Sequence, residues 1–139
     1  MMIPGRVRLR KKEIEIPPWR GMADETTTIA MLMAKVSAFV RARDWEKFHR
    51  PSNLAKAISI EAAELLELFQ WREDSQPLDA VTQARVEEEL ADVVIYCLSA
   101  ANTLGVDLSD IVVKKLARNE SRYPAGEWRG RARDASRDP

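Results

Sequence analysis

Two pairs of acidic residues repeat the same spacing near the middle of the chain. Glu61 and Glu64 in EAAE, and Glu89 and Asp92 in EELAD, are each three residues apart, so each pair shares one face of a helix. Glu61 and Glu89 also fall within the apolar stripes of their segments. A buried carboxylate without a partner is very costly, so these four acids need compensation.

Divalent cations would compensate four carboxylates that converge between two helices. An all-oxygen ligand set without His or Cys predicts Mg²⁺, with Mn²⁺ as the alternative ion. A di-iron carboxylate bundle would need Glu-x-x-His on two helices, whereas the single histidine, His49, lies outside both acidic motifs. The alternative that requires no metal places these acids on the solvated edges of their helices.

Basic and amide side chains near the end of the chain fit phosphate chemistry, which bound Mg²⁺ would favour. In VKKLARNESRYP, the residues Lys115, Asn119 and Arg122 form one helical stripe that can hold phosphates. The alternative is that cations in a last helical turn only complement the helix dipole.

Aromatic side chains at helix boundaries offer the other half of a nucleotide site. Trp45 and His49, four residues apart, and Trp71 can stack on or hydrogen-bond a base. The alternative for each is packing at the end of a helical bundle, and His49 alone is too ordinary to be assigned a catalytic role. Cys97 lies in an apolar run and is interpreted as a core residue and not as a nucleophile.

Helical periodicity organises the chain around these residues. With 139 residues, 45% hydrophobic and 32% charged, it has the composition of one globular domain. Apolar spacing predicts four helices, over residues 26–42, from a cap at Ser52 or Asn53 to residue 71, from an Asp79 cap to residue 104, and from an Asp107 cap onward, with Gly105 ending the third. Short links between them predict an all-α, antiparallel four-helix bundle over residues 25–124. Residues 1–24 are expected to form a flexible tail and residues 125–139 a disordered one.

The charge distribution and the cysteine count indicate a setting and exclude some partners. The formal net charge is zero, but residues 53–104 hold ten acidic against three basic residues, whereas residues 105–139 hold eight basic against six acidic. Overall neutrality argues against binding to a nucleic-acid polymer, and an acidic centre flanked by cations suits metal ions facing an anionic ligand. A single cysteine and no secretory or membrane-spanning apolar run predict a cytoplasmic protein without a membrane partner.

Three motifs then resemble one family. EAAE, EELADVVIY and KKLARNESRYP resemble the MazG-like, all-α nucleoside triphosphate pyrophosphohydrolase superfamily, and RDWEKFHRPSNLAKAISIEAAELLELFQW resembles its dCTP pyrophosphatase branch. The resemblance covers about residues 26–124. It implies Mg²⁺-dependent hydrolysis of dCTP, or of a related or modified pyrimidine deoxynucleoside triphosphate, to the monophosphate and pyrophosphate, for sanitation of the nucleotide pool. It also implies a homotetramer, or a dimer, with sites between subunits.

The resemblance carries roles onto matching positions. For the mechanism we expect one of the four carboxylates, not specified further, to deprotonate a metal-bound water that attacks in line. The implied metal ligands are Glu61, Glu64, Glu89 and Asp92; the residues around base and sugar are Trp45, His49, Trp71 and Tyr96; and the residues near the phosphates are Lys115, Asn119, Arg122 and Tyr123. The alternative function is a non-catalytic helical interaction module whose acids bind a regulatory divalent cation.

Overall fold

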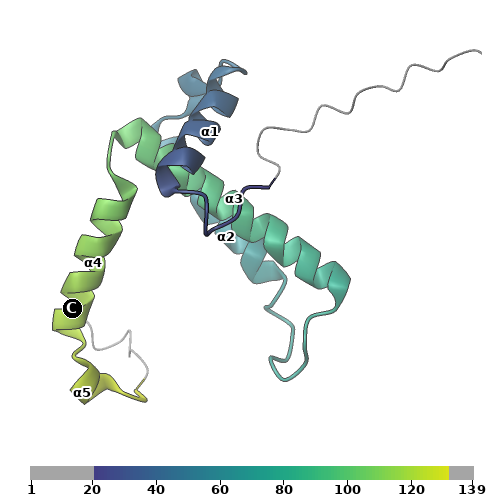
Figure 1. Cartoon of the computed structure of the whole chain (residues 1–139). Helices are drawn as coiled ribbons and strands as arrows, with labels where there is room; N and C mark the ends of the chain where they lie inside the picture. Colours follow the sequence, from purple (N-terminus) through teal and green to yellow (C-terminus); the bar gives the residue numbers. More distant parts are fainter. Residues whose placement is uncertain (1–20, 132–139) are drawn as a thin grey trace, which may run out of the picture.

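The computed structural model describes residues 21–131, and every regular element in that range is helical (Figure 1). The elements are α1 (Ile29–Arg41), the short 3₁₀ helix η1 (Glu46–Phe48), α2 (Pro51–Glu67), α3 (Ala80–Leu104), α4 (Leu108–Arg122) and the one-turn α5 (Ala125–Trp128). The all-α prediction is confirmed. No helix beyond Pro124 was predicted, and α5 forms there.

The starts of α1 and α3 follow from side chains that cap exposed backbone donors. Thr28 Oγ1 accepts a hydrogen bond from the Met31 N–H at 3.1 Å. At α3, Asp79 Oδ1 accepts from the backbone N–H groups of Val81 and Thr82 at 3.0 and 2.9 Å. Each cap satisfies donors that have no partner within the first turn of a helix. The cap predicted at Asp79 is therefore confirmed.

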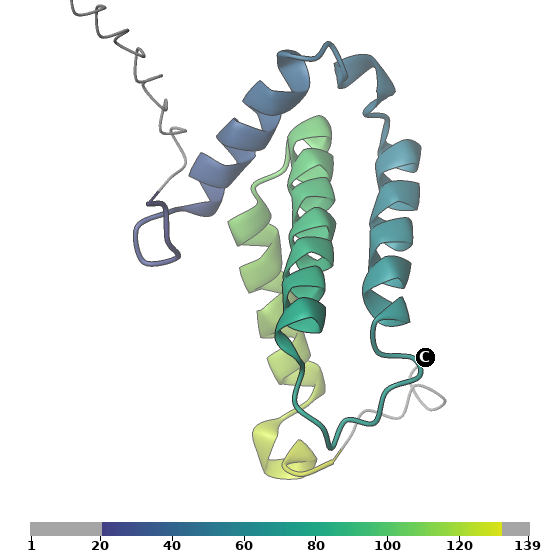
Figure 2. The ribbon, with the colours of Figure 1, turned by 90° about the vertical axis from the view of Figure 1, so that its right-hand side faces the viewer.

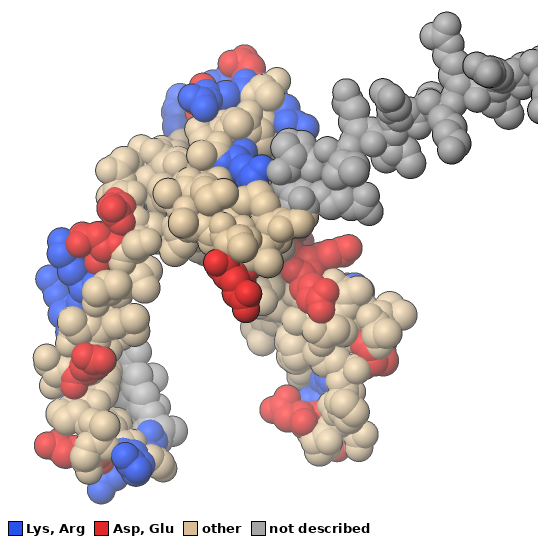
Figure 3. Space-filling view, viewed as in Figure 1, with Lys and Arg blue, Asp and Glu red and all other residues tan. Residues whose placement is uncertain are grey.

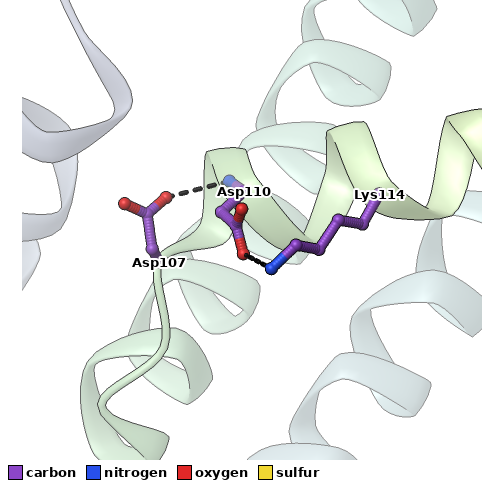
Figure 4. A network of polar contacts seen from close by, with 3 residues as sticks. All are labelled: Asp107, Asp110 and Lys114. Atoms are coloured by element: carbon purple, nitrogen blue, oxygen red, sulfur yellow. Dashed lines mark hydrogen bonds and ion pairs between the residues drawn. The ribbon is translucent and has the colours of Figure 1, made fainter.

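The link between α3 and α4 is also built as predicted. Gly105 ends α3 with a left-handed φ of 65°, which glycine adopts without a steric penalty. Asp107 Oδ1 then accepts from the Asp110 N–H at 2.9 Å and caps α4, and Asp110 pairs with Lys114 at 2.7 Å along the first turn (Figure 4). The link between α3 and α4 is thus only three residues long.

The start predicted for α2 is wrong. Neither Ser52 nor Asn53 is the cap, because the helix already begins at Pro51 and Arg50 occupies the capping position without a side-chain bond. Proline suits the first helical position, since its backbone nitrogen needs no partner there. The Asn53 amide nitrogen instead donates to the Phe48 carbonyl at 3.0 Å and ties α2 to η1.

The far end of α2 also differs from the prediction, because the helix stops at Glu67 and does not reach residue 71. The N–H groups of Phe69 and Gln70 both donate to the Leu66 carbonyl, which closes the last turn. Beyond it, the Arg72 guanidinium donates to the carbonyls of Gln76 and Pro77 and holds the loop that leads to α3.

Helix α3 is the centre of the fold, as its apolar sequence predicted. It packs along α2 on one side and against α1 on another (Figure 2). The buried apolar side chains come from all three helices and are Val40, Leu54, Leu98 and Ala101. Cys97, predicted to be a core residue, is half-buried on α3.

Helix α4 leaves this three-helix body. It bends by 105° from the axis of α3 and makes only marginal contacts with the other helices among the described residues (Figure 1). Its apolar residues Ile111, Val112, Val113 and Leu116 are all exposed. The space-filling view likewise shows broad uncharged areas on the surface of the molecule (Figure 3). Three helices of the predicted bundle therefore pack together within one chain, and the fourth does not.

No single helix among the described residues combines the length and apolar composition needed to cross a membrane; α3 and α4 meet that test only as a bent pair. The tails predicted over residues 1–24 and 125–139 lie largely outside the described range, apart from residues 21–24 and 125–131.

Candidate functional site

Carboxylates from α2 and α3 meet where the two helices run side by side. One oxygen of Glu61, one of Glu89 and one of Asp92 all lie within 4.8 Å of one another. Glu61 and Glu89 are half-buried and Asp92 is exposed. The convergence that the i, i+3 spacing predicted is thus present for three of the four acids.

The acidic cluster of Glu61, Glu64, Glu89 and Asp92 has pKa values raised at Glu61 and Glu89. The pKa of Glu61 is raised above its ordinary value, first by burial and then by the charges of Glu64, Asp92 and Glu89. Burial and the charge of Glu64 also raise the pKa of Glu89, and only Arg85 acts in the opposite direction. Glu64 therefore belongs to the acidic cluster through its charge and through side-chain hydrogen bonding with Glu61 and Glu89, although it is not one of the three residues whose oxygens lie within 4.8 Å of one another.

A hard divalent cation fits these residues. The donors are carboxylate oxygens from two rigid helices, and their spacing allows one ion to contact all three. A bound cation would also relieve the repulsion that raises the pKa values of Glu61 and Glu89. The chemistry of the donor set favours Mg²⁺ or Mn²⁺ over a metal that prefers nitrogen or sulfur.

A largely apolar cavity of about 430 Å³ adjoins this acidic cluster. It lies between α1 and α3, and the segment that follows α1 contributes to its lining. The predicted site residues Trp45, His49, Tyr96 and Asp92 all line it. Asp92 is therefore both a member of the acidic cluster and part of the cavity wall, which places a space for a flat, apolar group next to the proposed metal ligands.

Other predicted site residues lie elsewhere in the single chain. Trp71 follows the end of α2 with 90% of its surface exposed. Lys115, Asn119 and Arg122 lie on α4, and Tyr123 is the residue that ends that helix. None of these five lines the cavity. The Tyr123 ring instead packs edge-to-face against Trp128 of α5, with centroids 4.9 Å apart.

The cavity also contains residues that sequence reasoning missed. They come from two helical stripes and are Lys35, Val36, Phe39 and Val40 on α1 and Ile95 and Ser99 on α3. Ser99 is buried, with 3% of its surface exposed. Ile95 and Ser99 lie three and seven residues after Asp92, on the same face of α3. Helical periodicity counted from Asp92 would therefore have identified both residues. No comparable signal marks Lys35.

Four cavity residues are shared with a second, more polar space. This neighbouring cavity of about 270 Å³ is walled in part by Val36, Val40, His49 and Ser99. The other residues that line it are all polar, and they are Ser37, Glu46, Asn102 and Thr103. Asn102 is held in place because its amide nitrogen donates to the Met33 carbonyl at 2.9 Å.

Comparison with known proteins assigns this arrangement to a family. A family model described as the MazG-like family matches residues 56–136, which is more than half of the chain. The chain belongs to the MazG-like family. The MazG-like match includes both acidic motifs and α4, whereas α1 and the turn carrying Trp45 precede it.

Named relatives of this MazG-like chain extend the match toward its N-terminus. It is 44% identical over 98 residues to dCTP pyrophosphatase 1 of Rattus norvegicus, covering 68% of this chain and 58% of the relative. It is 44% identical over 91 residues to dCTP pyrophosphatase 1 of Homo sapiens, covering 63% and 54%. The chain thus spans less than two thirds of the length of these relatives.

A solved structure supports the MazG-like fold. The crystal structure of a pyrophosphatase from Archaeoglobus fulgidus superposes with a TM-score of 0.63 and is 36% identical in sequence. The match covers 74% of this chain and 98% of that protein.

Proposed function

We propose that this chain hydrolyses deoxynucleoside triphosphates, with dCTP or a modified pyrimidine analogue as substrate, to the monophosphate and pyrophosphate. The observation that carries the proposal is the position of Asp92, which joins the acidic cluster to the apolar cavity. A base in the cavity would direct its phosphates toward that cluster. The identity to proteins named dCTP pyrophosphatase 1 supports the choice of substrate.

The acidic cluster would hold the cation that this reaction needs. Glu61, Glu89 and Asp92, with Glu64 beside them, would bind Mg²⁺. When bound, the ion supplies charge neutralisation and polarisation of phosphate oxygens. A carboxylate of the acidic cluster accepts the proton of a water that attacks the α phosphorus, while the bond to the bridging oxygen breaks and pyrophosphate leaves.

The cavity would bind the base and the sugar. Trp45 and Tyr96 offer aromatic surfaces, and His49 offers a polar edge between the two neighbouring cavities. Because stacking tolerates every base, it sets affinity more than identity, and polar contacts around His49 would have to discriminate between bases.

The remaining predicted residues would join the site through a second copy of the chain. Trp71 and the stripe of Lys115, Asn119 and Arg122 lie away from the cavity of their own chain. The exposed apolar side chains of α4 would pack on a partner, complete the four-helix bundle and bring these groups to a shared site in a dimer or tetramer. Light scattering coupled to size exclusion would test this, and a monomer at micromolar concentration would contradict it.

A product assay tests the proposed reaction. Purified protein incubated with MgCl₂ and a panel of dNTPs, including modified pyrimidines, should convert dCTP to dCMP and pyrophosphate, separated by ion-exchange chromatography. The same protein with EDTA is the control for metal dependence. Formation of dCDP and orthophosphate would contradict the cleavage position, and Mg²⁺ binding without turnover of any nucleotide would favour a non-catalytic, cation-binding module.

We also propose a reducing, cytoplasmic setting, which the lone Cys97 supports.

A further inference from the structure

The chain reverses sharply between the end of α1 and Trp45. Asp44 adopts a left-handed backbone conformation with φ of 53°, the single non-glycine residue of the described range with positive φ. The Trp45 N–H then donates back to the Val40 carbonyl at 3.1 Å, one turn inside α1. Trp45 is therefore held against the helix that it has just left, next to the side chain of Phe39.

Three side chains stack at this reversal. The rings of Phe39 and Trp45 meet edge-to-face, with centroids 5.9 Å apart and planes inclined by 73°. The Arg43 guanidinium lies 3.6 Å from the Phe39 centroid and 5.9 Å from the Trp45 ring. Arg43 Nη1 also donates to the Phe39 carbonyl at 3.0 Å, so the cation is fixed to the helix end as well as to the ring.

The stack forms one wall of the apolar cavity. Phe39 and Trp45 line that cavity, and Arg43 does not. The two rings remain about half exposed, at 50% and 44%. Burial alone therefore does little to fix their orientation, whereas a cation over the face of one ring and an edge-to-face contact with the other are directional.

We propose that Arg43 is a positioning residue for substrate binding, which holds Phe39 and, through it, the Trp45 ring in the orientation that receives the base. This inference rests on the proposed function for the identity of the ligand. Arg43 touches neither the acidic cluster nor the cavity, so it acts on the pre-organisation of the wall and not on the hydrolytic step. Its removal should therefore change KM and leave kcat nearly unchanged.

The first measurement uses the free protein and no nucleotide. The Trp45 indole resonance, assigned from its loss in Trp45→Phe, should shift and broaden in Arg43→Met. Lys47→Met is the matched control, because Lys47 also lies over a phenylalanine ring, that of Phe48 at 5.3 Å, and belongs to the same turn. An indole resonance that is unchanged in Arg43→Met, or shifted equally in Lys47→Met, would overturn the inference.

The second measurement is steady-state hydrolysis of dCTP. Arg43→Met should raise KM about fivefold with kcat within about twofold, as expected for loss of a cation–π contact. Arg43→Lys, which keeps the charge, should restore part of the affinity. Phe39→Leu removes the ring through which Arg43 acts, so adding Arg43→Met to Phe39→Leu should have almost no further effect on KM.

An Arg43→Met effect that is the same with and without the Phe39 ring would overturn the inference. If the wild-type protein hydrolyses no nucleotide, the proposed function fails. The indole resonance then still decides whether Arg43 positions Trp45.

Discussion

Asp79 caps the start of α3 and Glu89 lies ten residues further along the same helix, yet their surroundings shift their pKa values in opposite directions. The Asp79 carboxylate accepts from the Thr82 hydroxyl at 2.7 Å and from the backbone of Thr82 and Val81, which lowers its pKa below the ordinary value. The pKa of Glu89 is raised by burial and by the charges of Glu64 and Asp92. An acid surrounded by donors stabilises the folded chain, whereas an acid surrounded by acids lowers its stability, an arrangement that is frequent at binding sites.

The largest effect expected from this comparison is on turnover. Glu61→Gln or Glu89→Gln should reduce Mg²⁺-dependent hydrolysis of dCTP by about 100-fold or more, because each removes a charged ligand of the acidic cluster. Asp79→Asn is the control and should keep wild-type turnover. Full activity in Glu61→Gln would exclude the acidic cluster as the metal site.

The next effect is on the response of stability to metal. A cation that binds only the folded protein should raise its free energy of unfolding, by about 2.7 kcal/mol at 100 times its Kd. Thermal unfolding with and without MgCl₂ should show this gain for the wild-type protein and for Asp79→Asn, and lose it in Glu89→Gln. Without metal, Glu89→Gln should be at least as stable as wild type, since the repulsion is relieved. A metal response that survives in Glu89→Gln would contradict the assignment.

Removal of the cap should affect the fold and leave the site intact. Asp79→Ala leaves the first N–H groups of α3 without an acceptor and should lower Tm by a few degrees. Activity per folded molecule should stay at the wild-type level. An unchanged Tm would show that the cap hydrogen bonds contribute nothing to stability.

The smallest effect is on the pH dependence of stability in EDTA. Asp79 has a lowered pKa, so its stabilisation is present above the ordinary value of 3.8 and is lost as the pH falls through the lowered pKa. Glu61 has a raised pKa, so the folded chain loses stability as the pH rises from 4.5 through the raised value. Urea unfolding from pH 3 to 7 should show the difference in stability between the wild type and Asp79→Asn shrinking at the acidic end, and the wild type and Glu61→Gln diverging above pH 4.5. Parallel curves for all three proteins would refute both assignments.

Local chemistry was predictable from the sequence, and long-range placement was not. The caps at Asp79 and Asp107 and the glycine at residue 105 depend on neighbours within a few residues, and the structure confirms them. The meeting of Glu61 with Glu89 was also predictable, because two amphipathic helices must face each other with their apolar stripes. The start of α2 was missed because Ser and Asn are typical capping residues, which favoured Ser52 or Asn53, whereas the helix begins at Pro51.

The cavity and the course of α4 required the structure. Lys35 and Phe39 line the cavity only because α1 packs against α3, and nothing in their local sequence indicates this. The end of α3 at Gly105 was predicted, but the 105° bend between the axes of α3 and α4 was not. The predicted nucleotide site also has Trp71 beside the base and Lys115 beside the phosphates, and within one chain neither residue lines the cavity.

The exposed apolar residues of α4 have a consequence for the life of the protein in a cell. A newly made subunit presents Ile111, Val112 and Leu116 to its surroundings until another surface covers them. Chaperones and proteases act on such surfaces, so under the proposed assembly a subunit without a partner would be removed faster than an assembled one. In the proposed dimer or tetramer, the stability of the folded subunit would depend on its own concentration, and the cellular level of the protein would have a threshold below which newly made chains do not accumulate.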